Sequence, residues 1–278
     1  EEPEQPEEPE QPAEPTYTEV EVTPENYVEK LAAAVEFTAF KFAAGEYNTA
    51  VTVAVNNVKF VGPNAGKAGN AADRAEEAVF AEPVTLAENV KGFSFDGFKL
   101  TGAFQLLLST GNENVALVNN FIEGTAGAKD GIVNSNAGEV KNIKVNYNYS
   151  AELANYRFIR VGDGGTIEGL EVIGNDITGT SNHYDFLNCQ GTICGVVVVK
   201  DNKHVNSQQS FLYAIHMKAI DCTISGNYVE GQANTAIDFR DCQGDGAFKF
   251  VIEFNEFQYA GLGWMPILVR SNNSDEND

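Results

Sequence analysis

The chain has 278 residues, of which 43% are hydrophobic, and its formal net charge is −22 at pH 7. A chain of this length can bury a sizeable core, and its acidity argues against a nucleic acid or an anionic membrane surface as partner. No apolar run reaches the roughly 18 residues that a membrane-spanning helix needs.

Residues 1–16, EEPEQPEEPEQPAEPT, form a low-complexity segment. Pro interrupts helices and sheets and the Glu side chains repel one another, so we predict a disordered, solvated tether over residues 1–18. The segment resembles the acidic spacer that follows the lipidated cysteine of surface lipoproteins in Gram-negative bacteria. This resemblance implies an exported protein, held at the cell surface by an N-terminal lipid on the outer membrane. An ordinary disordered leader is the alternative.

Residues 19–35 are predicted to cap the N-terminal end of the fold. Thr23 and Pro24 are a typical N-cap and first helical residue, and an apolar stripe through Tyr27, Val28 and Leu31 follows. A helix over residues 23–34 would cover the open end of the first coil, where unpaired strand edges invite aggregation.

Strand-like segments follow, separated by Gly45 and by Gly62–Pro63. Residues 64–83 are polar and rich in Ala, and we predict an excursion loop there. From Val84 to Arg270 apolar and polar residues alternate in short segments, the pattern of strands with one buried face. The last eight residues, 271–278, are predicted to be a flexible tail.

One asparagine recurs after the second strand of each segment, at intervals of 28, 27, 27, 25 and 28 residues: Asn120, Asn148, Asn175, Asn202, Asn227 and Asn255. Gly97 is placed in the same position one repeat earlier. A fixed period of this length indicates a solenoid, and the alternation excludes a helical repeat. We therefore predict an all-β fold, a right-handed parallel β-helix of about eight coils over residues 19–270.

The recurrent asparagine has a structural role in this fold. Side-chain amides stacked at one bend can hydrogen-bond from coil to coil, and asparagine tolerates the left-handed conformation of a tight corner. We predict that the six asparagines form such a ladder.

The four cysteines lie at related positions of neighbouring coils. Cys194 and Cys222 are predicted to stack on adjacent coils, either as free thiols or as a disulfide. The chain has no CxxC motif and three His residues, so no zinc site is expected.

One strand of each coil offers a candidate binding surface. Alternation predicts that Ile159, Val161, Leu187, Cys189, Ile215, Met217, Ile237, Phe239, Ile267 and Val269 point inward. The residues between them then form two outward columns, Arg160, Asn188, His216, Asp238 and Leu268, and beside these Gly162, Gln190, Lys218, Arg240 and Arg270.

Aromatic residues lie in the loops that lead into these strands, namely Tyr156, His183, Tyr184, Phe211, Tyr213 and Trp264. Rings of this kind stack on sugars, and cationic and amide side chains bind their hydroxyl and carboxylate groups. The pattern therefore favours a polysaccharide site on this surface, with Tyr184, Tyr213 and Trp264 as stacking residues. A surface that is merely solvated, or that binds a protein of a surface complex, is the alternative.

The architecture resembles the pectate-lyase-type β-helix. Within it, IHMKAIDCTISGNYVEGQANTAIDFRDC is similar to polysaccharide lyase family 6, the chondroitinase B and alginate lyase type. This resemblance implies that Lys218 abstracts the proton next to a uronate carboxylate and that Arg240 assists at the leaving oxygen. In the family, acids just upstream of the lysine hold Ca²⁺. Here that segment reads SFLYAIHMK, without those acids, so we expect neither a metal site nor a cofactor; Ca²⁺, as in the family, is the alternative.

These observations leave three functions open: a non-catalytic glycan-binding surface protein, a lyase acting on an acidic polysaccharide, and a structural component of a surface assembly. The lyase requires Lys218 and Arg240 on adjacent coils, about 5 Å apart at Cα. We predict that Asp238 forms a salt bridge with one of these two cations, or that His216 bridges them. Such a pairing would oppose the use of Lys218 as a base.

Overall fold

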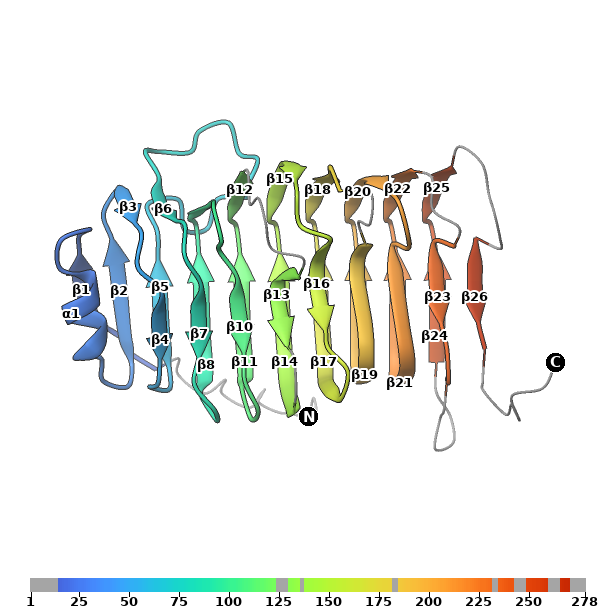
Figure 1. Ribbon diagram of the computed structural model, residues 1–278, viewed down its shortest axis with the longest axis horizontal. Helices are drawn as coiled ribbons and strands as arrows, with labels where there is room; N and C mark the ends of the chain where they lie inside the picture. The colour runs from blue at the N-terminus through green and yellow to red at the C-terminus, as the bar shows by residue number, and fades with distance from the viewer. Residues whose placement is uncertain are drawn as a thin grey trace, which may run out of the picture.

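The computed structural model describes residues 15–123, 130–135, 138–181, 185–231, 235–242, 249–259 and 266–270. These residues wind into a right-handed parallel β-helix, elongated along the coil axis (Figure 1). The predicted fold class is confirmed. The alternating pattern explains it, because each strand turns one row of side chains into the interior.

The wall of the solenoid has three faces. Face 1 contains β1 (Thr18–Val22), β2 (Thr38–Phe42), β5 (Val58–Val61), β8 (Lys91–Asp96), β11 (Glu113–Val118), β14 (Gly138–Asn146), β17 (Gly165–Ile173) and β24 (Lys249–Glu253). Face 2 is a separate nine-stranded sheet of β3 (Gly45–Tyr47), β6 (Ala78–Phe80), β9 (Lys99–Leu100), β12 (Phe121–Glu123), β15 (Tyr149–Leu153), β18 (Asp176–Gly179), β20 (Lys203–Ser207), β22 (Tyr228–Gly231) and β25 (Glu256–Tyr259).

Face 3 contains β4 (Val51–Val53), β7 (Val84–Leu86), β10 (Leu106–Leu108), β13 (Gly131–Ser135), β16 (Arg157–Val161), β23 (Ile237–Phe239) and β26 (Ile267–Val269). Two long strands, β19 (Asp185–Lys200) and β21 (Leu212–Ser225), run from face 3 around the corner into face 1. The nine strands of face 2 correspond to nine coils, close to the number predicted.

The interior is a continuous column of apolar side chains. In the first coils it is aromatic: the Phe42 ring lies 5.1 Å from Phe60 and 5.4 Å from Phe80, and Phe95 lies 4.2 Å from Phe98, measured between ring centroids. Later coils are filled mainly by Val, Ile and Leu. Ile267 and Val269, predicted to point inward, are exposed by 38% and 42% because they belong to the last described coil.

The N-terminal cap contains α1 (Tyr27–Ala32), as predicted, and also β1, which was not predicted. The buried ring of Tyr27 packs edge-on against Tyr47, 5.1 Å away, at the start of face 2. The predicted N-cap was wrong: Asn26 precedes the helix, and its Oδ1 accepts a hydrogen bond from the Thr23 N–H at 2.9 Å. Because of this turn, the helix begins at Tyr27, three residues after Pro24.

The predicted excursion loop is correct only in part, because β6 lies within residues 64–83 and belongs to face 2. The loop that precedes β6 crosses the next coils and is hydrogen-bonded to them (Figure 1). The Arg74 guanidinium forms a salt bridge with Glu77 at 2.7 Å and donates to the carbonyl oxygens of Phe98 and Asn119. The Gly69 N–H donates to the Tyr147 carbonyl at 2.8 Å.

The asparagine ladder is confirmed. In each step the Nδ2 of one asparagine donates to the Oδ1 of the next at 2.8–3.0 Å, and the same Oδ1 accepts the backbone N–H of the first. Each Nδ2 also donates to a backbone carbonyl of the previous coil. The ladder joins Asn120, Asn148, Asn175, Asn202, Asn227 and Asn255.

Two details of the ladder differ from the prediction. The Phe98 N–H donates to Asn120 Oδ1, so Phe98 and not Gly97 occupies the equivalent position one coil earlier. The left-handed backbone conformation lies at the residue before each asparagine, for example Gly174 at φ 65° and Asp201 at φ 53°. The asparagines are therefore selected for their hydrogen bonds, and the corner geometry is supplied by the residue before them.

The predicted stacking of Cys194 on Cys222 was also wrong. Cys194 is paired with Lys218 across the strands, whereas Cys222 is paired with Val197 and points into the core. All four cysteines are free thiols. Burial raises the pKa of the Cys189 and Cys222 thiols to about 12.

Candidate functional site

A polar column runs along the outside of face 3, one residue per coil. The strand register places Asn134 beside Arg160, Arg160 beside Asn188, Asn188 beside Tyr213, and Tyr213 beside Asp238, which is followed by Leu268. Four of the five predicted members of the column are therefore correct. The fifth, His216, was wrong, because Tyr213 takes its place.

The length of one coil explains the error. Asn188 and Tyr213 are 25 residues apart, the same spacing as Asn202 and Asn227, the shortest interval in the ladder. A spacing of 28, as in the previous coil, leads to His216 instead. For the same reason Leu212 and Ala214 fill the core here, and the predicted inward Ile215 is only half-buried.

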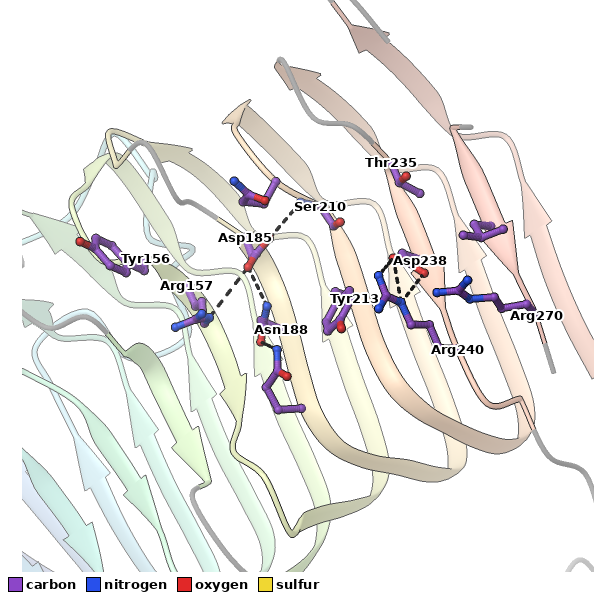
Figure 2. A pocket seen from close by; sticks show the side chains of 13 residues that line it. Tyr156, Arg157, Asp185, Asn188, Ser210, Tyr213, Thr235, Asp238, Arg240 and Arg270 are labelled. Atoms are coloured by element: carbon purple, nitrogen blue, oxygen red, sulfur yellow. Dashed lines mark hydrogen bonds and ion pairs between the residues drawn. The ribbon is translucent and has the colours of Figure 1, made fainter. Parts of the chain in front are cut away.

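From Asn188 to Leu268 the column forms the floor of a groove of about 620 Å³ that extends from β16 to β26 (Figure 2). Tyr156 and Arg157 lie at its N-terminal end, Tyr213 lies in the middle, and Arg240 and Arg270 lie at its C-terminal end. Most of the lining residues are polar or charged. A groove of this size is in the range that binds small molecules and segments of polymers.

Asp185 organises the N-terminal half of the groove. It is buried, with 4% of its surface exposed, and its Oδ2 accepts a hydrogen bond from Asn188 Nδ2 at 2.7 Å while Oδ1 accepts the Ser210 N–H at 2.9 Å. Arg157 Nε lies 3.9 Å from the same carboxylate. Gln190 Nε2 extends the network by donating to Asn188 Oδ1 at 3.1 Å. These bonds compensate the buried charge and fix the amide groups.

Asp238 and Arg240 organise the C-terminal half. Asp238 lies on the outside of β23, and Arg240 directly follows the end of that strand. Arg240 Nη2 donates to Asp238 Oδ2 at 2.7 Å, and Arg240 Nε donates to both carboxylate oxygens at 3.2 Å. The guanidinium carbon also lies 4.9 Å from the centroid of the Tyr213 ring, a cation–π contact. The hydrogen bond to Asp238 raises the pKa of Arg240, so the guanidinium is held charged and in one orientation.

The predicted salt bridge of Asp238 is confirmed, with Arg240 as its partner. The predicted adjacency of Lys218 and Arg240 was wrong. The Arg240 N–H donates to the Ala214 carbonyl, and the Arg240 carbonyl accepts the Met217 N–H, so Arg240 lies beside Ile215 and His216. Lys218 pairs with Cys194 on the face 1 side of the corner and does not line the groove.

Lys218 continues a column of alternating charge on that corner. The register runs from Lys91 to Glu113, Lys141, Glu168, Cys194 and Lys218. Lys91 forms a salt bridge with Glu113 at 2.8 Å, and Lys141 forms one with Glu168. Opposite charges on neighbouring strands stabilise the first steps of this column, and Lys218 lies at its end, beside the uncharged Cys194.

Some of the remaining predicted site residues lie at the groove, and others lie away from it. Arg160 forms a salt bridge with Asp130 at 2.7 Å next to the groove, and Arg270 lines it. His216 lies outside it, with Nδ1 2.7 Å from Asp241 Oδ2. Phe211, predicted to be an outward ring, is buried against Phe186. Tyr184, Trp264 and also His183 lie outside the described residues.

Sequence reasoning missed Arg157, Gln209, Ser210 and Thr235 as lining residues. They stand at the start of strands or just before them, in segments that connect face 2 to face 3. The alternation that identified the columns does not extend into these segments. A signal was nevertheless present, since Arg157 and Asp185 both lie three residues before a predicted outward residue.

No protein-family model matches the chain, and no curated protein matches it either. The structure itself establishes the β-helix fold. The one described helix is too short and too polar to cross a bilayer. In the part of the chain that the structure describes, no three potential His, Cys, Asp or Glu ligands come together as a metal site.

Proposed function

We propose that this protein binds a glycan in the groove of face 3, as a non-catalytic module of the cell surface. The observation that carries the proposal is the combination, in one groove, of an oriented aromatic ring with fixed polar groups. Tyr213 supplies the ring, and the Asp185 and Asp238 networks hold amide and guanidinium donors around it. Apolar ring faces and hydroxyl groups are the two features that a sugar presents to a protein.

Affinity electrophoresis tests this proposal. The protein is run in gels that contain alginate, chondroitin sulfate, pectin or the neutral polymer dextran. We expect retardation by at least one polymer, and Tyr213→Ala should weaken that binding about tenfold through loss of the ring contact. Tyr228→Ala, a substitution on the outside of face 2, is the matched control and should bind like the wild type. Unretarded migration in all four gels would contradict the proposal.

A lyase is the second candidate, and Arg240 in the groove is the observation in its favour. The resemblance to polysaccharide lyase family 6 also requires a base beside the arginine, and Lys218 lies outside the groove. The alternative predicts unsaturated products. Ultraviolet absorbance during incubation with alginate, chondroitin sulfate and pectin, with Ca²⁺ supplied, measures them, and we expect no increase.

We further propose that the protein is displayed on the outer membrane as a lipoprotein, on the basis of the acidic tether of residues 1–16. Protease treatment of intact cells should then remove it, and labelled palmitate should be incorporated into it.

A role as a structural component of a surface assembly is the further alternative. It predicts that cross-linking on cells captures a defined protein partner while no polysaccharide retards the protein.

A further inference from the structure

The two halves of the groove differ in charge. In the N-terminal half, Arg157 lies near the buried carboxylate of Asp185, and the other polar side chains that line it are uncharged amides and hydroxyls. In the C-terminal half, Asp238 is the one acid among the lining residues, and it lies beside two arginines, Arg240 and Arg270. The C-terminal half therefore carries one positive charge in excess, on a chain whose formal net charge is −22.

The strand register places these two arginines next to each other. The Arg270 N–H donates to the Phe239 carbonyl at 3.0 Å and the Cys242 N–H donates to the Arg270 carbonyl at 3.1 Å, so Arg270 lies alongside Arg240 on the next coil. Neighbouring coils are about 4.8 Å apart. Figure 2 shows the Arg270 side chain extending toward Arg240 and Asp238.

Asp238 balances only one of the two cations. Its contacts are with Nε and Nη2 of Arg240, and no ion pair joins Arg270 to an acid in the described part of the chain. Nη1 of Arg240 likewise forms no hydrogen bond to the described residues. The groove thus presents one guanidinium edge that is held in place and a second guanidinium beside it.

We infer that Arg240 and Arg270 form an anion subsite at the C-terminal end of the groove, which holds one carboxylate or sulfate group of the bound glycan. The inference rests on the proposed function, since it names the chemistry of the ligand at that site. Guanidinium groups bind such oxyanions through paired charge-assisted hydrogen bonds. Asp238 and the Tyr213 ring fix Arg240 before the ligand arrives, so little side-chain entropy is lost on binding.

The same geometry orients the ligand. Its charged unit lies over Leu268 at the C-terminal end, and its neutral, hydroxyl-rich part lies over Asn188 and Gln190 at the N-terminal end. A neutral polymer would leave the excess charge of Arg270 unmatched, and a second anionic group at the N-terminal end would lie near the buried carboxylate of Asp185. The preferred ligand is therefore a glycan with acidic and neutral parts.

Chondroitin sulfate and its chemically modified forms distinguish the two anion sources. Wild-type protein, Arg270→Gln and the control Lys144→Gln, which lies on face 1, are compared on native, desulfated and carboxyl-reduced polymer. Arg270→Gln should bind the native polymer about tenfold more weakly, while the control is unchanged. Loss of binding on desulfation assigns the subsite to sulfate, and loss on carboxyl reduction assigns it to carboxylate. Equal affinity of wild type and Arg270→Gln for every acidic polymer would overturn the inference.

A second measurement makes the subsite testable without any polymer. In a sample with ¹⁵N-labelled arginine, sodium sulfate and sodium acetate are titrated while the Arg240 Nε–Hε resonance is followed. We expect a saturable shift that Arg270→Gln abolishes and Lys144→Gln preserves. A saturable shift without retardation by any polysaccharide would refute the proposed glycan function and retain the anion subsite. The absence of a saturable shift would refute the subsite.

Discussion

His204 is a histidine placed where its charged form is not tolerated. Its side chain is fully buried inside face 2, where its ring centroid lies 5.3 Å from that of Phe186 and 5.5 Å from that of Phe211. Burial lowers its pKa from 6.5 to about 3. The folded protein therefore keeps this imidazole neutral over a pH range in which the unfolded chain binds a proton.

This pKa shift predicts a loss of stability in acid. Because the pKa is lower in the folded state, the unfolded state binds the extra proton below pH 6.5, and stability falls as the pH is lowered toward 3. At pH 5 the loss relative to pH 8 should be about 2 kcal/mol. Urea unfolding at pH 5 and pH 8 measures this loss as a difference in the free energy of unfolding. In His204→Leu that difference should be smaller by about 2 kcal/mol.

Other groups also titrate in this range, so the comparison of the variant with wild type is decisive. Ile177→Val, a core substitution on the neighbouring strand, is the control and should shift the free energy of unfolding equally at both pH values. An unchanged pH dependence in His204→Leu would show that the buried imidazole is not responsible.

The asparagine ladder is the element that keeps successive coils in register. In its interior, Asn175 Oδ1 accepts from the side chain and backbone of Asn148, and Asn175 Nδ2 donates to Asn202 Oδ1 and to the Val145 carbonyl. These partners are buried, and they have no access to water when the amide is removed. Asn255 is less buried and forms the last described step.

This difference predicts unequal effects of the same substitution. Asn175→Ala should destabilise the protein by about 3 to 5 kcal/mol, because several buried donors and acceptors lose their partner together. Asn255→Ala should cost about 1 kcal/mol, since water can replace the lost contacts there. Chemical denaturation of both variants gives the two values. Equal destabilisation would mean that the ladder does not act through its buried hydrogen bonds.

At the scale of the whole molecule, the solenoid is a one-dimensional stack in which each coil contacts mainly its neighbours. Tyr149 and Asp176 are register partners, and each directly follows a ladder asparagine. Residues 149–175 therefore comprise one complete coil between equivalent points of the wall.

Deletion of residues 149–175 should leave a folded, shorter solenoid with Asn148 next to Asn202 in the ladder. We expect a β-type far-UV spectrum, cooperative urea unfolding and an m-value smaller by roughly a tenth, in proportion to the surface removed. Deletion of residues 149–162, about half a coil, should abolish cooperative unfolding because strands of different faces would be brought into register. If both deletions fold equally well, the coil is not the structural unit.

The sequence by itself determined the repeat, the ladder and the inward or outward direction of most side chains. Strand alternation has a period of two, and the ladder asparagines recur at nearly one spacing, so both are visible locally. Arg160, Asn188 and Asp238 were therefore placed on the outside of face 3 correctly, and the salt bridge of Asp238 with a nearby cation followed from charge.

The tertiary structure alone decided which of these residues lie side by side. The coils of the asparagine ladder differ in length by up to three residues, and part of such a difference is absorbed at corners such as the one between Cys189 and Thr192, where the register of β19 and β21 shifts. Tyr213 lies beside Asp238 because the coil between them is 25 residues long, and the same length places Arg240 beside Ile215, three residues before Lys218. The groove therefore depends on corner geometry, whose spacing is set by packing and hydrogen bonds between coils and is not encoded in a local pattern.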